Sequence, residues 1–147
     1  MKTSQLIRTA IAACLATAAL GAMAQSARPY REGAVTEVSS IRTKDGHFED
    51  YMKFLDTQYK PLMEAYKKAG LILDYHVYGA SPRAPGEPDL FLAITYANMA
   101  ALDRIEETIK VSETALGSMA QQEKAQADRG VIRDVLGSQL IRELVLK

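Results

Sequence analysis

The sequence predicts an α+β domain of ferredoxin-like topology, a four-stranded antiparallel sheet with helices on one face. A long helix of regular apolar period lies between two strand-like segments, and a second strand-helix-strand series follows it. In chain order the predicted elements are strand 34–43, helix 46–69, strands 71–80 and 89–96, helical segment 99–128 and strand 139–146. This βαββαβ order is typical of a half-barrel completed by a second copy. We therefore expect a homodimer through the sheet, a dimeric α/β barrel.

The first 24 residues have the composition of an export signal and are left out of the predicted fold. Lys2 and Arg8 give a basic start, residues 9–20 form an apolar run, and Ala22-Met23-Ala24 fits the small-x-small cleavage rule. The uncharged stretch is shorter than the ~20 residues that a membrane-spanning helix needs. We therefore expect cleavage after Ala24, a periplasmic or secreted protein, and no membrane span.

Cys14 leaves an alternative open within the same segment. Ile11-Ala12-Ala13-Cys14 resembles the lipobox of bacterial lipoproteins, in which an acylated cysteine becomes the mature N-terminus. The apolar stretch between Arg8 and Cys14 is shorter than the usual apolar region of about 7–15 residues. Soluble export is therefore the favoured prediction, and lipid labelling of Cys14 would overturn it.

Composition excludes several classes of function for the exported chain. Cys14 is the only cysteine, so a chain cut after Ala24 has no disulfide, thiolate metal site or cysteine nucleophile. Such a chain has 16 basic and 18 acidic residues without a basic cluster, which disfavours nucleic acid as a partner. The two histidines, His47 and His76, lack a metal-binding spacing. We therefore expect neither a metal nor a cofactor.

Residues 25–33 are expected to form a mobile polar leader, and the domain proper covers residues 34–147. The β-branched content of residues 34–43 predicts the first strand. Lys44-Asp45-Gly46 predicts the turn that follows.

The first helix, residues 46–69, is predicted from the clearest period in the chain. Apolar side chains recur every three or four residues from Phe48 to Tyr66, and charged side chains occupy the other side. Gly70 is well placed to end the helix. Pro61 lies within the pattern, so we expect a local bend or break there.

In the predicted second strand, residues 71–80, odd- and even-numbered side chains point to opposite faces of the sheet. One set should pack under the helix: Leu73, Tyr75 and Val77. The other set mixes apolar and ionisable groups, as the wall of a small polar cavity does: Ile72, Asp74, His76 and Tyr78.

A loop and a buried strand come next. Residues 81–88 contain three prolines and a glycine, which predicts a loop. Residues 89–96 are almost continuously apolar, which indicates a strand buried on both faces. Asn98 is placed to cap the helix that follows.

The helical segment 99–128 has an interrupted pattern. We expect a bend near Lys110 and a weak point at Gly117. Two further glycines, Gly130 and Gly137, are expected to bracket a turn before the last strand.

Two segments carry a family resemblance. Residues 43–51 (TKDGHFEDY) resemble the strand-to-helix corner of NIPSNAP-type proteins of the dimeric α/β-barrel superfamily, where a Lys-x-Gly-x-Phe segment leads into an amphipathic helix. Residues 91–101 (FLAITYANMAA) are similar to the superfamily's third strand and the small-residue helix after it. The resemblance covers residues 33–104 and implies the dimeric barrel fold without a catalytic residue. Haem-degrading members use a tryptophan in the haem pocket, and this chain has no Trp, which disfavours haem.

His76 is the best candidate for a functional side chain. It is predicted in mid-strand beside Asp74 and Tyr78, where an imidazole could act as general base or ligand contact. The alternative is a histidine hydrogen-bonded across the sheet or the dimer interface. His47, at the start of the first helix, is expected to be exposed.

Charged residues in the first and last strands give a second set of candidates. Glu37 could meet Arg142 or His76 within one cavity, but an ion pair on the sheet surface or between subunits is the favoured interpretation. The tyrosines, Tyr96 among them, are interpreted as core or interface residues.

The favoured hypothesis is a protein that binds a small, partly apolar or aromatic molecule between the sheet and the helices. The cavity would be lined by Glu37, Ile72, Asp74, His76, Tyr78 and Arg142. A reaction there would be cofactor-independent proton transfer or oxygenation, with His76 as base and Tyr78 or Arg142 stabilising an oxyanion. The alternative is a non-catalytic envelope structural or interaction protein whose barrel is filled by side chains.

Overall fold

The computed structural model describes residues 28–147. The predicted signal segment 1–24, with its Cys14 lipobox, lies outside the described residues. Within the described part, no helix combines the length and apolar character needed to cross a membrane.

The described residues belong to two compact units. The larger unit, Glu32–Glu143, carries the helices and the candidate site. The smaller one brings residues 28–31 together with 144–147. Within it, the backbone N–H of Lys147 donates to the carbonyl of Pro29 at 3.0 Å.

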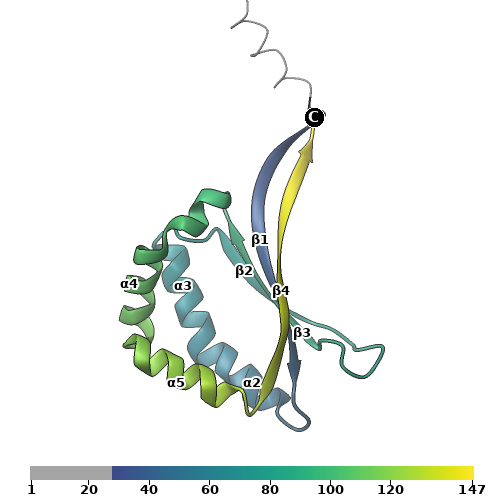
Figure 1. The fold of residues 1–147 in the computed structure, drawn as a ribbon, viewed down its shortest axis with the longest axis vertical. Coiled ribbons are helices and arrows are strands. Elements are labelled where there is room, and N and C mark those ends of the chain that lie inside the picture. The colour runs from purple at the N-terminus through teal and green to yellow at the C-terminus, as the bar shows by residue number, and fades with distance from the viewer. Residues whose placement is uncertain (1–27) are drawn as a thin grey trace, which may run out of the picture. The chain divides into compact units, whose positions relative to one another are not determined.

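The sheet has four strands in the order β2-β3-β1-β4 (Figure 1). They are β1 (Tyr30–Thr43), β2 (Asp74–Gly79), β3 (Leu90–Tyr96) and β4 (Arg133–Leu146). The central strand β3 is antiparallel to β1, with Val35 opposite Tyr96, and to β2, with Asp74 opposite Thr95. The predicted ferredoxin-like topology is confirmed.

Three predicted strand boundaries are wrong. The first strand begins at Tyr30, so the end of the expected mobile leader is part of the sheet. The second begins at Asp74 instead of residue 71, because the chain is still leaving the helix at Leu71. The last begins at Arg133, so Gly137 lies inside a strand and not at a turn.

The first helical segment contains a wide turn next to its proline. It consists of α2 (Phe48–Phe54), a π-helical turn η2 (Leu55–Tyr59) and α3 (Lys60–Lys68). At the junction, the N–H of Lys60 donates to the carbonyl of Leu55, five residues back instead of four. Pro61 has no N–H with which to continue the normal ladder. The predicted local break at Pro61 is therefore confirmed.

Two apolar clusters join this segment to one face of the sheet. In the first, Tyr51 and Leu55 pack with Ile41 and Leu90. In the second, Met63 packs with Leu71 and Ile72, and partly buried side chains of β2 and β3 adjoin it. Gly70 ends the helix with a positive φ of 66°, as predicted.

The second helical region has one short and two longer helices, η3 (Met99–Asp103), α4 (Ile105–Leu116) and α5 (Met119–Arg129). The side chain of Asn98 accepts from the N–H of Ala101 at 3.2 Å, so the predicted cap is confirmed. The expected bend near Lys110 is wrong, because α4 continues through it. The break comes at Gly117, where φ is 88°.

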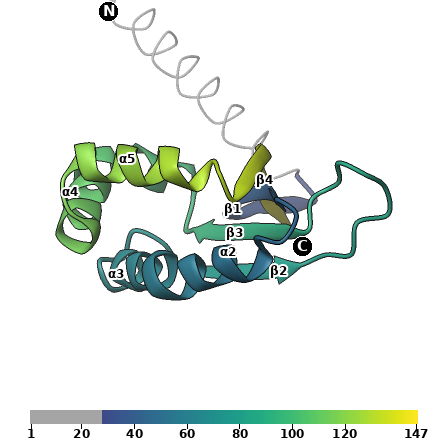
Figure 2. The ribbon, with the colours of Figure 1, turned by 90° about the horizontal axis from the view of Figure 1, so that it is seen from below.

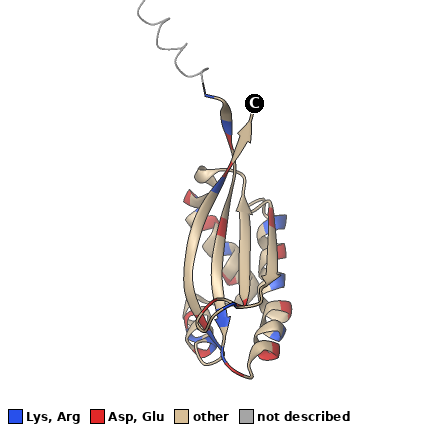
Figure 3. Ribbon diagram, turned by 90° about the vertical axis from the view of Figure 1, so that its right-hand side faces the viewer, with Lys and Arg blue, Asp and Glu red and all other residues tan. Residues whose placement is uncertain are grey.

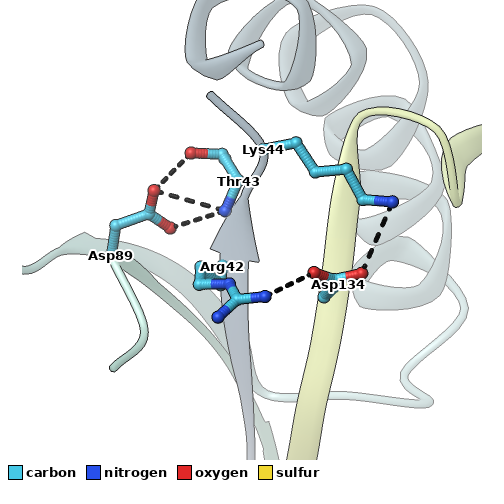
Figure 4. A network of polar contacts seen from close by, with 5 residues as sticks. All are labelled: Arg42, Thr43, Lys44, Asp89 and Asp134. Carbon is cyan, nitrogen blue, oxygen red and sulfur yellow. Dashed lines mark hydrogen bonds and ion pairs between the residues drawn. The ribbon is translucent and has the colours of Figure 1, made fainter. Parts of the chain in front are cut away.

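Polar contacts join the ends of three strands at one corner (Figure 4). The guanidinium of Arg42 lies 2.8 Å from Asp134, and Nζ of Lys44 lies 3.7 Å from the same carboxylate. Asp89 accepts from the backbone N–H of Thr43 at 3.0 Å and from its hydroxyl. The hydrogen bond from Arg42 holds the pKa of Asp134 below its usual range.

The two faces of the sheet differ in their coverage. The helices lie to one side of the strands (Figures 1 and 2). The register places the even-numbered side chains of β1 and β2 and the odd-numbered ones of β3 on the other, open face. Figure 3 looks toward this face, and most of its strand ribbon carries no charged residue.

Candidate functional site

A cavity of about 170 Å³ lies between α3, the end of β3 and the η3–α4 segment. Its apolar lining is Leu71, Ile72, Ala101, Leu102, Ile105 and Ile109, and its polar lining is Tyr66, Tyr96 and Thr108. An apolar cavity of about 150 Å³ is large enough for benzene. This cavity therefore suits a molecule the size of a single aromatic ring.

Local sequence features hold the cavity walls together. After Gly70 turns the chain, the N–H of Leu71 donates to the carbonyl of Tyr66 at 3.0 Å. The guanidinium of Arg104 donates to the carbonyl of Gly70 at 2.7 Å, which joins the end of α3 to the start of α4. The wall is fixed at both ends by hydrogen bonds to the backbone.

The polar side of the cavity leads to a carboxylate. Tyr96 lines the cavity from β3, and Glu37 lies next to it on β1. Burial, followed by the nearby Glu37 carboxylate, raises the pKa of Tyr96 to about 12. The hydroxyl of Ser138 on β4 donates to Glu37 at 3.0 Å. A neutral phenol thus lines the apolar cavity, and a carboxylate that does not line the cavity lies next to it.

More tyrosines extend this polar group under α3. The hydroxyl of Tyr75 donates to Glu64 at 2.8 Å. Its ring lies 6.0 Å from that of Tyr59, in an edge-to-face arrangement. The Tyr59 hydroxyl is buried without a hydrogen-bond partner, and burial is the main cause that raises its pKa. A buried hydroxyl without a hydrogen bond lowers the stability of the fold. The Tyr59 hydroxyl is therefore free to bond to a polar group that comes within reach.

These tyrosines should make the protein sensitive to alkaline pH. Burial is the main cause that raises the pKa of Tyr75 and of Tyr96 from 10.0 to about 12. Between these values the unfolded chain loses phenolic protons that the folded chain keeps, so the free energy of unfolding falls as pH rises. Below the unfolded pKa the contribution is fully present. We expect urea-unfolding stability to decline from pH 10 to pH 12.

Tyr96→Phe provides the comparison for this titration. It removes one of the shifted phenols, so the decline between pH 10 and 12 should become shallower than in wild type. A wild-type slope equal to that of Tyr96→Phe would contradict the raised pKa of Tyr96.

The structure divides the predicted site residues between different places. Asp74, His76 and Tyr78 do share one face, and the His76 and Tyr78 rings are 5.7 Å apart. That face is the open one, so these three do not line a cavity between sheet and helices. Nε2 of His76 lies 3.5 Å from Asp74, and Lys67 donates to the same carboxylate at 2.9 Å.

Ile72 and Leu73 have exchanged their predicted places. Ile72 is buried in the core beside Met63, and Leu73 is 53% exposed. The strand starts only at Asp74, so the alternation that the sequence suggests does not reach back to these two residues. Ile72 does line the cavity, from the helix side of the sheet.

Glu37 meets neither Arg142 nor His76 within a cavity. Nη1 of Arg142 lies 2.6 Å from Glu32, and Glu37 takes Ser138 as its partner. The other histidine, His47, is half-exposed at the start of α2 as expected and lies 2.8 Å from Asp50. Among the described residues, no group of three His, Cys, Asp or Glu side chains could hold a metal ion.

Sequence reasoning did not identify most of the cavity lining. The sequence favours core or interface positions for Tyr66 and Tyr96, and nothing in it distinguishes Ile105 and Ile109 from other apolar helix residues. The spacing of four between Ile105 and Ile109 marks one helix face. It does not show that this face meets the end of β3.

The strand order and the single helical layer define the chain as a ferredoxin-like α+β protein. It is similar to the crystal structure of HapK from Hahella chejuensis, with a TM-score of 0.50 and 12% identity over 74% of this chain and 91% of that one. It is also similar to protein SO0527 from Shewanella oneidensis, with a TM-score of 0.50 and 14% identity over 79% and 96% of the two chains.

A structure described as a dimeric ferredoxin-like protein from an uncultured marine organism has a TM-score of 0.49 and 12% identity, over 80% of this chain and 90% of that one. At such identities a likeness concerns the fold alone. No family model matches this sequence, and no curated protein matches it.

Proposed function

We propose that this chain is an exported protein that binds a small, partly apolar molecule, about the size of one aromatic ring, in the cavity beside Tyr96. The observation that carries the proposal is a cavity of about 170 Å³ with apolar walls and a phenol–carboxylate pair at its edge. Small-molecule sites commonly combine apolar walls with a few placed polar groups.

The polar groups favour a ligand with one hydrogen-bonding substituent. The phenol of Tyr96 stays protonated at neutral pH and can hydrogen-bond to a ligand, while Glu37 lies next to Tyr96 without lining the cavity. A phenol or a similar ring alcohol can pair with Tyr96 or Thr108 while its ring occupies the apolar part. The pair also supports cofactor-independent proton transfer, in which Tyr96 takes a proton from the substrate as it passes its own proton to Glu37.

The open face of the sheet supports the second part of the proposal, a homodimer through the sheet. The centre of this face carries Val38, Ser40 and Ala93, and Asp74 and His76 lie beside them on the edge strand β2. Apolar side chains of β4 are also exposed, among them Val135 and Ile141. Monomers seldom leave so much apolar surface uncovered. Export, cleavage after Ala24 and membership of the NIPSNAP-type group belong to the same proposal.

Native mass spectrometry of the protein purified from its own cell envelope is the first test. We expect a dimer that carries the mass of one ring-sized molecule per chain. An empty dimer would favour a non-catalytic envelope protein with a filled barrel, and a stable monomer would contradict the shared barrel.

A titration with 4-methylphenol, followed by the shift in Tm, tests the cavity itself. Ile109→Trp should fill the cavity from α4 and abolish the shift, because Ile109 is partly exposed and a larger ring can be accommodated at this rim. The matched control is His76→Ala on the open face, which should bind like wild type. Loss of binding in His76→Ala with retention in Ile109→Trp would move the site to the open face.

A further inference from the structure

Two arginines meet at one oxygen atom near the end of α5. Nη2 of Arg129 lies 2.6 Å from Oε1 of Gln126, and Nη2 of Arg133 lies 3.3 Å from the same atom. Each guanidinium also stacks on a ring. Cζ of Arg129 lies 4.5 Å from the centre of the Phe54 ring, and Cζ of Arg133 lies 5.6 Å from that of Tyr51.

These contacts hold two positive charges together in a partly desolvated place. Arg133 is only 9% exposed, and Nε of each arginine is buried without a hydrogen-bond partner. Arginine keeps its charge under all ordinary conditions. Burial is the main cause that lowers the pKa of Arg129, and repulsion by the charge of Arg133 lowers it further.

Neither arginine has a carboxylate partner within residues 28–147. Arg42, Arg104 and Arg142 are different, since each forms an ion pair. A neutral amide oxygen is the only acceptor shared by the Arg129–Arg133 pair. Buried charges are normally paired, so this arrangement is short of one negative charge.

The pair adjoins empty space between α5 and the first helical segment. Two hollows, of about 330 and 300 Å³, share Arg129, Gln58 and Ala125 in their linings. Phe54 and Leu62 contribute apolar surface to them. Neither hollow shares a lining residue with the cavity beside Tyr96.

We propose that the Arg129–Arg133 pair is a second binding site, which takes the carboxylate of an organic acid whose apolar part lies in the hollow beside Phe54. The amide oxygen of Gln126 occupies the place of one carboxylate oxygen. Gln126 is exposed, so its side chain can leave without disturbing the core. The planar guanidinium matches a carboxylate with two parallel hydrogen bonds.

The acidic residues nearby do not fill this place. Glu123 and Asp128 line the hollows, but neither forms an ion pair with Arg129 or Arg133 in the described part of the chain. An organic acid is favoured over a small inorganic anion because Phe54, Ala125 and Ile132 give the hollow beside the pair an apolar part.

Gln126→Glu tests the missing charge directly. The substitution places a carboxylate of the same shape between the two guanidiniums, and we expect Tm to rise by roughly 3–6 °C. At this place in the last turns of α5, the helix dipole alone would make a negative charge unfavourable. In an Arg129→Gln background, Gln126→Glu should raise Tm much less than it does in the wild-type protein. A fall or no change in Tm with Gln126→Glu would contradict the charge deficit.

Sodium hexanoate, titrated against sodium chloride at equal ionic strength, tests the ligand. We expect hexanoate to raise the Tm of wild type, while Arg129→Gln and Gln126→Glu show no response. Arg83→Gln, on an exposed loop, is the control and should respond like wild type. Gln126→Ala should respond at least as strongly, because it removes the competing oxygen.

Two results would overturn the assignment. If inorganic phosphate shifts Tm as much as hexanoate does, the site takes any oxyanion and its apolar neighbour plays no part. If no anion shifts the Tm of wild type, the two arginines only stack on Tyr51 and Phe54. Because Arg129 and the cavity beside Tyr96 are separate, loss of the hexanoate response should leave 4-methylphenol binding unchanged.

Discussion

Tyr51→Ala is expected to lower the free energy of unfolding by about 3–5 kcal/mol, as is usual when a buried aromatic side chain is truncated. Tyr51 is 1% exposed and packs with Ile41, Leu55 and Leu90 in the core between α2 and the sheet. Its ring also stacks on Phe54 at 5.6 Å between centres. Truncation would therefore leave a cavity and remove a surface on which Arg133 rests.

Urea unfolding with linear extrapolation measures this effect. Phe48→Ala is the matched control, because Phe48 lies on the same helix but is 43% exposed, and its loss should be much smaller. Tyr51→Phe keeps the ring and loses only the hydroxyl, which interacts with Arg133, so it should cost only about 1 kcal/mol. Equal losses for Tyr51→Ala and Phe48→Ala would show that this core is not packed as described.

Local chemistry explains which parts of the fold the sequence could predict. The apolar period of residues 46–69 depends only on neighbours in the chain, and it correctly predicts α2 and α3. Gly70 and Asn98 act within one turn of their helices, so their roles are also readable. The break near Pro61 can be predicted because proline itself lacks the N–H that a regular helix needs at that position.

Predictions failed where position depends on distant contacts. The predicted alternation of side chains between the two faces of β2 is correct from Asp74 onward but wrong at Ile72. The strand can begin only after the chain has left α3. No local breaker stands at Lys110, whereas Gly117 can take a positive φ without strain.

The candidate site was the least predictable part for the same reason. Its cavity joins Tyr66, Tyr96 and Ile109, which lie far apart in the sequence and meet only when α4 packs against α3. Arg129 and Arg133 look like ordinary solvated charges in the sequence. Their lack of carboxylate partners becomes visible only when the surroundings of both are known.

A charge at the centre of the open sheet face should separate the proposed homodimer. Ala93 lies on the central strand between Val38 and His76, on the face opposite the helices. Ala93→Glu would place a carboxylate at the centre of the interface, on a face that already carries Asp74, so we expect the dimer dissociation constant to rise by at least about 100-fold. Analytical ultracentrifugation over a dilution series measures this change.

Tyr78→Glu separates the effect on the dimer from an effect on the fold. Tyr78 lies on the same face but is 51% exposed, so a charge at this position can be solvated in the monomer. Tyr78→Glu should therefore leave the helical circular dichroism signal of the protein intact. Lys53→Glu on α2 changes the net charge on the helix side and should leave the dimer unchanged. If both sheet variants fold and remain dimeric, the dimer uses another surface. The exposed apolar side chains of the open face, such as Tyr78, would then need a different partner to cover them.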